Sequence, residues 1–138
     1  MSPIEFTETV SDITNDCIHI EKTWGYENIF TNNELYCGKI ITINKDSISS
    51  GGKFHYHKIK DETFFVVDGC LILELIINGE INSFILVPDK MTAIRIKPNT
   101  PHRFKGVSDC TFIEVSTHHE DSDSYYLNDN QTIERSNQ

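Results

Sequence analysis

Two histidines separated by a single residue, His55 and His57, stand shortly before Glu62 in the chain. Side chains two residues apart share one face of a β-strand, so both imidazoles can bind one metal ion through their ring nitrogens. The spacing to Glu62 lets the chain turn at residues 58–61 and return as a strand that presents a carboxylate oxygen to the same ion. His102 begins a strand-like segment directly after a turn and is the candidate for a fourth ligand.

Two imidazoles and a carboxylate form a ligand set that leaves coordination positions open for a substrate or water. Such a set suits iron, manganese, nickel, cobalt or zinc. Buried imidazole and carboxylate groups are also costly without an ion to pair with them. The sequence therefore predicts one divalent transition metal ion per chain as cofactor, bound by His55, His57, Glu62 and His102.

The elements that must position these groups are predicted to be β-strands, because short apolar runs and alternating patterns replace long helical stripes. Asn78 and Gly79 form a strong hairpin signal, since both residues tolerate positive φ. Strands of this length, separated by frequent turns, favour a sandwich, a barrel or a jelly roll. The predicted strands cover residues 36–44, 62–67, 70–77, 80–87, 91–97, 102–105 and 110–116.

Composition limits the classes of partner. The chain has 138 residues, 38% of them hydrophobic and 24% charged, which suits one globular domain. Its 21 Asp and Glu against 12 Lys and Arg give a net charge of -9. This acidity disfavours nucleic acid and anionic membrane surfaces as partners, and leaves a small molecule as the expected ligand.

Targeting signals and cysteine spacing indicate a cytoplasmic protein. Residues 1–10 do not resemble a signal peptide, and no stretch approaches the roughly 18 apolar residues that span a bilayer. The four cysteines form no CxxC pair, and we expect them to be reduced thiols. We expect an N-terminal arm at residues 1–16, a single domain at 17–126 and a polar, mobile tail at 127–138.

From His55 to Gly69 the chain resembles the first motif of the cupin superfamily, with HxH, four residues, Glu62, six residues and a glycine. It departs from the motif at Ser49, where the family has a leading glycine. Residues 97–102 (KPNTPH) resemble the turn of the second motif, and Gly106 stands where that motif has a final Asn. The resemblance implies an all-β cupin fold, a double-stranded β-helix or jelly-roll barrel, with the metal ligands facing the barrel interior.

Three segments outside these motifs look like cupin-type mannose-6-phosphate isomerases, which also occur as the C-terminal domain of bifunctional guanylyltransferase-isomerases. They are residues 21–27 (EKTWGYE), 36–39 (YCGK) and 112–117 (FIEVST). This resemblance implies a role in carbohydrate metabolism, as an aldose-ketose isomerase of a sugar or sugar phosphate. In that reaction the metal polarises the carbonyl and its neighbouring hydroxyl, while a base moves a proton between C1 and C2.

Glu114 is our candidate for that catalytic base. It lies in an otherwise apolar segment, where an inward-facing carboxylate would be desolvated and its pKa raised. Lys39, Lys22 and Arg103 are candidate substrate-binding residues for hydroxyls or a phosphate. Arg103 directly follows His102, so a regular strand would send it to the opposite face.

Other readings of the sequence stay open. The ligand set also suits another metal-dependent cupin enzyme, such as a dioxygenase, lyase or epimerase, or a cupin that binds a small ligand without turnover. The pair His118 and His119 is either part of a solvated turn or a lid over the site. A homodimer is expected, because a second copy or the N-terminal arm can cover the sheet edges of a short barrel.

Overall fold

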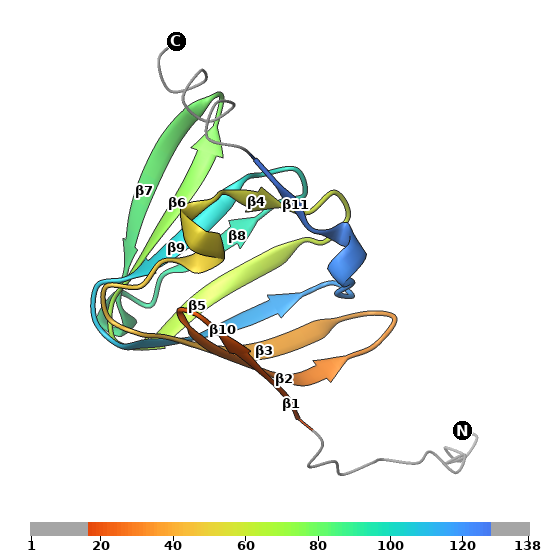
Figure 1. The fold of residues 1–138 in the computed structure, drawn as a ribbon, viewed down its shortest axis with the longest axis horizontal. Helices are drawn as coiled ribbons and strands as arrows, with labels where there is room; N and C mark the ends of the chain where they lie inside the picture. Colours follow the sequence, from red (N-terminus) through yellow and green to blue (C-terminus); the bar gives the residue numbers. More distant parts are fainter. Residues whose placement is uncertain (1–16, 128–138) are drawn as a thin grey trace, which may run out of the picture.

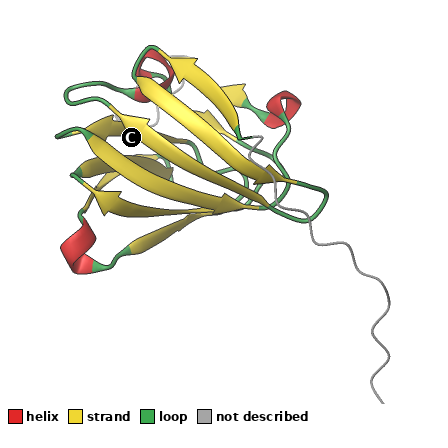
Figure 2. Cartoon of the chain, turned by 90° about the horizontal axis from the view of Figure 1, so that it is seen from below, coloured by secondary structure: helices red, strands yellow, loops and turns green. Residues whose placement is uncertain are grey.

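Short β-strands make up most of residues 17–127, the part of the chain that the computed structural model describes. The remaining secondary structure is three 3₁₀ turns, and Figure 2 shows them as short coils between the strands. The turns are η1 (Ser49–Gly52), η2 (Pro88–Lys90) and η3 (Asp121–Asp123). The strands are β1 (Ile18–Lys22), β2 (Gly25–Asn32), β3 (Cys37–Ile43), β4 (His55–Tyr56), β5 (Glu62–Asp68), β6 (Leu71–Ile77), β7 (Glu80–Leu86), β8 (Ala93–Ile96), β9 (His102–Gly106), β10 (Cys110–Ser116) and β11 (Tyr125–Tyr126).

The strands form two antiparallel sheets that face each other (Figure 1). One sheet has the order β1-β2-β3-β10-β5-β8, and the other has the order β11-β4-β9-β6-β7. From β3 to β11, the last described strand, successive strands lie in alternate sheets. The exception is the pair β6 and β7, which form a hairpin within one sheet. This alternation is the topology of a jelly roll, so the predicted all-β jelly-roll fold is confirmed.

All seven predicted strands form, with ends that differ by at most a few residues. At the predicted hairpin, Asn78 and Gly79 have φ of 53° and 79°, in the left-handed region that such a turn requires. Sequence reasoning missed β2, because its sequence GYENIFTN does not alternate and its side chains are mostly half-buried. The strand expected to carry both histidines is only the two-residue β4, which contains His55 and ends before His57. Strand β11, which also has two residues, was missed.

One half of the barrel interior is an apolar core. Phe112 is fully buried, and its ring contacts the rings of Phe64 and Phe104 at centroid distances of 5.0 and 5.1 Å. Trp24 packs edge-on against Phe104 at 5.1 Å. Around these rings lie aliphatic side chains from both sheets: Ile41, Ile43, Val66, Leu71, Leu73, Leu75, Leu86 and Ile96.

The other half of the interior is polar, because the inward-facing side chains change from apolar to charged along each strand. On β10 the inward residues run from Cys110 through Phe112 to Glu114. On β3 they run from Ile43 through Ile41 to Lys39, and β10 pairs with β3 so that Glu114 is opposite Lys39. Strands β5 and β9 place Glu62 and His102 at the same end.

The expected N-terminal arm lies outside the described residues, as does residue 128 onward of the expected tail. Leu127, with which we began the tail, is buried against Phe54 and Ile76. The cysteine thiols at positions 17, 37, 70 and 110 are all free. Among residues 17–127, no helix is long and apolar enough to cross a bilayer.

Phe112→Ala should lower the free energy of unfolding by about 3–5 kcal/mol, because it leaves a cavity among rings that cannot collapse into it. Ile85→Ala on the outer face of β7 is the control, since its side chain is 68% exposed and its loss should cost less than about 0.5 kcal/mol. Urea denaturation followed by tryptophan fluorescence measures both. Equal losses in the two variants would contradict the assignment of the core.

Candidate metal centre

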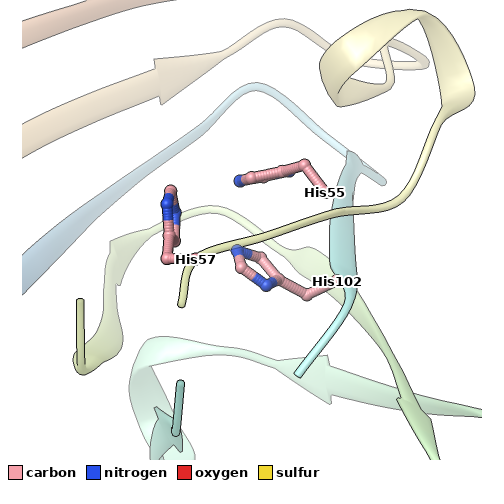
Figure 3. A group of neighbouring side chains, drawn as sticks. All are labelled: His55, His57 and His102. Carbon is pink, nitrogen blue, oxygen red and sulfur yellow. The ribbon is translucent and has the colours of Figure 1, made fainter. Parts of the chain in front are cut away.

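Three imidazole rings converge at the polar end of the barrel (Figure 3). His55 is on β4, His57 follows that strand, and His102 begins β9. Strands β4 and β9 are neighbours, and His55 and His102 are directly paired across them. One ligand atom from each of the three residues lies within 4.8 Å of the others, as the binding of a single ion requires.

Backbone carbonyls fix the tautomers of two of these rings. His57 Nδ1 is 2.8 Å from the carbonyl oxygen of Asp123, and His102 Nδ1 is 2.9 Å from that of Thr100. A carbonyl oxygen only accepts hydrogen bonds, so each Nδ1 carries the proton and donates it. In the neutral rings this leaves Nε2 with a free lone pair, which is the form of histidine that binds metals.

Glu62 contacts two of the histidines from the adjacent strand. Its Oε1 is 2.9 Å from His102 Nε2 and 3.8 Å from His57 Nε2. The angles at the shorter contact are not those of a hydrogen bond, and both Glu62 Oε1 and His102 Nε2 are buried without a hydrogen-bond partner. Buried acceptors that face each other in this way are costly unless a cation lies between them. Three imidazoles and this carboxylate therefore fit a divalent transition metal ion.

The protonation states also suit a metal. Burial lowers the pKa of His57, and it lowers the pKa of His55 well below its ordinary value, with a further contribution from His102. Both rings are therefore neutral near pH 7 and need not lose a proton to bind an ion. Burial alone would raise the pKa of the Glu62 carboxyl, but the adjacent His102, Lys60 and His57 hold it well below its usual range.

Sequence reasoning missed Lys60, which lies between the two buried carboxylates. Its side chain is 2% exposed, and its Nζ is 3.2 Å from Glu62 Oε2 and 2.8 Å from Glu114 Oε2. Burial acts to lower the pKa of Lys60, but the two glutamates outweigh burial and raise it, so the ammonium stays charged. The only sequence signal was the position of Lys60 two residues before Glu62, in a loop that otherwise resembles a solvated turn.

Glu114 lines the same cavity as His55 and His57 and is buried. Burial raises the pKa of its carboxyl, and the charge of Glu62 adds to this effect, while Lys60 and Lys39 act against it. This is the environment that the sequence predicted for Glu114. Its role as a base remains a proposal.

Charged side chains of alternating sign run from the metal centre to the mouth of the cavity. Beyond Glu114, Lys39 Nζ is 4.0 Å from Glu114 Oε2 and 3.1 Å from Glu27 Oε1. At the mouth, Lys22 Nζ is 3.8 Å from Glu27 Oε2. We call this row the charge ladder, and it consists of Glu62, Lys60, Glu114, Lys39, Glu27 and Lys22.

The cavity between the two sheets has a volume of about 650 Å³. The histidines at positions 55 and 57 and most of the charge ladder line it, and Trp24, Phe64 and Phe104 close its apolar end. Two of the predicted substrate-binding residues, Lys39 and Lys22, are part of its wall.

Arg103 does not line the cavity, so its assignment as a substrate-binding residue is corrected. Its side chain lies on the other face of β9, where it donates to Glu74 Oε1 at 2.9 Å and to the carbonyl oxygen of Gly52 at 2.6 Å. The guanidinium also stacks over the ring of Phe54 at 4.1 Å. The alternation of side chains along β9 is the reason, because His102 points inward and its neighbour must point outward.

The sequence left open whether His118 and His119 lie in a solvated turn or cover the site, and the two residues differ in this respect. His118 is on the surface, where its ring bonds to the Asn33 carbonyl and to Glu120. His119 is part of the cavity wall, with its Nδ1 3.2 Å from Lys60 Nζ and its ring 6.4 Å from that of His57. The chain therefore covers the site at His119.

No protein-family model and no curated protein matches this sequence. Among solved structures, the capsular polysaccharide assembling protein CapF from Staphylococcus aureus is similar, with 18% identity and a TM-score of 0.72 over 84% of this chain and 33% of that one. Oxalate decarboxylase from Bacillus subtilis has 16% identity and a TM-score of 0.67 over 88% of this chain and 33% of that one. KdgF from Halomonas sp. has 17% identity and a TM-score of 0.61 over 80% of this chain and 95% of that one.

These neighbours are cupin-fold proteins, and at such low identity the likeness concerns the fold alone. The chain has the predicted cupin double-stranded β-helix. It spans about a third of the CapF and oxalate decarboxylase chains. The closer resemblance to mannose-6-phosphate isomerases stays a prediction.

His57→Ala should lower the metal content of the purified protein at least tenfold and leave the fold intact, because it removes one ligand and leaves a small polar gap. Elemental analysis after loading with Zn²⁺ and dialysis measures the occupancy. His19→Ala is the matched control, since His19 lies on the surface between Glu21 and Asn28. Full occupancy in a folded His57→Ala protein would refute the assignment.

Proposed function

We propose that this protein is a metal-dependent cupin enzyme that interconverts the aldose and ketose forms of a sugar. The observation that carries the proposal is the buried Glu114 carboxyl, which lines the same cavity as His55 and His57 of the histidine cluster and has a raised pKa. Isomerisation needs a base whose pKa lies near the working pH, and an ordinary surface glutamate does not meet that need. Burial inside the barrel raises the pKa of Glu114 in the direction that such a base requires.

The charged groups around the cavity would have separate roles in such a reaction. A divalent ion held by His55, His57, Glu62 and His102 would polarise the carbonyl of a bound sugar and its neighbouring hydroxyl. Glu114 takes the proton from the carbon beside the carbonyl and returns it to the former carbonyl carbon, while the hydroxyl proton passes from the neighbouring hydroxyl to the former carbonyl oxygen. Lys60, 2.8 Å from Glu114 Oε2, stabilises the carboxylate form of Glu114 before the first proton transfer and after the second. Trp24, Phe64 and Phe104 exclude water from the inner end of the cavity.

The charge ladder favours an uncharged sugar over a sugar phosphate. Lys60 and Lys39 each lie between two carboxylates, so neither ammonium is free to pair with a phosphate. Lys22 is half-exposed at the mouth and has one carboxylate partner at 3.8 Å. Alternating carboxylates and ammonium groups are well suited to accept from and donate to the hydroxyls of a polyol. CapF, a capsular polysaccharide assembling protein, places the same fold in a carbohydrate context.

A second candidate is another metal-dependent cupin reaction, and the ligand set itself favours it. Histidines and one carboxylate that leave open positions support oxygen chemistry on iron as well as proton transfer. Oxalate decarboxylase shows that the fold accommodates a reaction other than isomerisation. Oxygen consumption that depends on ferrous iron, with no exchange at a sugar C2, would favour this candidate.

Glu114→Gln should reduce solvent-deuterium exchange at C2 of the substrate by about 10²–10⁴-fold and leave the metal content unchanged, because the amide cannot accept the proton. Proton NMR in D₂O, with metal-loaded protein and a panel of aldoses, ketoses and their phosphates, measures the exchange. Glu74→Gln is the matched control, since Glu74 is buried and paired with Arg103 outside the cavity. The isomerase proposal fails if no sugar exchanges with the wild type, or if Glu114→Gln exchanges at the wild-type rate.

The same panel tests the preference for uncharged sugars. The free sugar that exchanges should do so faster, at equal concentration, than its own phosphate, because the ladder offers no unpaired ammonium deep in the cavity. Lys22→Met should leave the rate for the free sugar within a few-fold of wild type. A phosphate that exchanges faster than its free sugar, and loses this advantage in Lys22→Met, would show that Lys22 binds a phosphate group.

A further inference from the structure

The segment His119–Leu127, which we call the C-terminal strap, contacts His57 and the strand that carries His55. Its strand β11 pairs with β4, so that Tyr126 is opposite His55, and Figure 1 shows the two short strands side by side. The backbone N–H of Leu127 donates to the carbonyl oxygen of Phe54 at 2.9 Å. The strap begins 50 residues after the first cupin-like motif ends at Gly69, yet it contacts the strand that carries the first histidine of that motif.

Asp123 makes the most direct contacts between the strap and the metal centre. Its backbone carbonyl accepts the hydrogen bond from His57 Nδ1 at 2.8 Å. Its buried carboxylate accepts from the backbone N–H groups of three successive residues: Lys58 at 2.9 Å, Ile59 at 3.2 Å and Lys60 at 3.0 Å. One residue therefore holds both the ring of His57 and the turn that follows it.

The conformation of this turn decides which side chain enters the barrel. Ile59 is apolar but 77% exposed, whereas Lys60 is charged but 2% exposed. Hydrophobicity alone would favour the opposite arrangement. With Ile59 outside and Lys60 inside, the Asp123 carboxylate accepts hydrogen bonds from three backbone N–H groups. The two glutamates then pair with the Lys60 ammonium. Without the Asp123 carboxylate, these donors would be left without their protein partner.

We propose that Asp123 is a positioning residue of the metal centre. Its carbonyl holds His57 in the tautomer whose Nε2 binds the ion, and its carboxylate fixes the turn that delivers Lys60 to Glu62. The C-terminal strap thus helps to orient the metal ligands, although it belongs to neither of the two cupin-like motifs. The inference rests on the metal site of the proposed function and concerns how tightly that site binds, whatever reaction it carries out.

Zn²⁺ affinity and histidine tautomers test this inference on the full chain. Competition with a chromophoric chelator gives the dissociation constant for Zn²⁺, and ¹⁵N-detected long-range NMR of the metal-free protein gives the tautomer of each ring. Asp123→Asn keeps one oxygen acceptor and should weaken Zn²⁺ binding about tenfold, within the range for residues that orient metal ligands. Asp123→Ala should weaken it further. The wild-type His57 ring should carry its proton on Nδ1 alone.

Asp109→Asn is the matched control, because the Asp109 carboxylate also accepts from a backbone N–H, that of Lys45 at 2.8 Å, but does not line the cavity. Its Zn²⁺ affinity should equal that of the wild type. The inference is overturned if folded Asp123→Asn and Asp123→Ala proteins bind Zn²⁺ as tightly as the wild type.

The tautomer measurement decides the case in which the Asp123 variants do not fold. A wild-type His57 ring with its proton on Nε2 would overturn the inference without any variant, and a proton on Nδ1 would support it. If the wild type binds no metal at all, the proposed function fails, and the tautomer still reports whether Asp123 orients His57.

Discussion

The burial of two glutamates at one end of the barrel is the constraint on which the rest of the site depends. Ionised carboxylates taken out of water are costly unless cations compensate them, and Glu62 and Glu114 both lie inside the barrel. Lys60 lies between them, and Lys39 compensates Glu114 from the far side. The remaining unpaired atom, Glu62 Oε1, faces the histidines, where it and their ring nitrogens offer a set of ligands for a metal ion.

Because of this constraint, the interior has an apolar half that stabilises the fold and a polar half that forms the site. The apolar half, packed around Phe112, supplies stability that does not depend on any ligand. The polar half contains side chains that a well-packed core would exclude, and each is held by partners from another strand or loop. Such local departures from the rules of core packing are typical of functional sites, where stability elsewhere in the domain offsets their cost.

Residues that lie in regular strands could be predicted well. The inward direction of Glu114 and the outward direction of Arg103 both follow from the alternation of side chains along a strand. Lys60 and Asp123 could not be found in this way, and the role of His119 was left open, because all three lie outside the strands, where no period determines which side chain points inward. The contacts of Asp123 with residues 57–60 join positions more than 60 residues apart, and no local pattern encodes such contacts.

By itself, the sequence determined the all-β fold, the positions of most strands and the spacing that brings His55 and His57 together, because these depend on local periodicity and turn chemistry. Only the tertiary structure decided that His102 pairs with His55, that Lys60 and not Ile59 enters the barrel, and that the C-terminal strap orients His57. These features depend on strand register and on hydrogen bonds between distant segments, which form only when the two sheets close on each other.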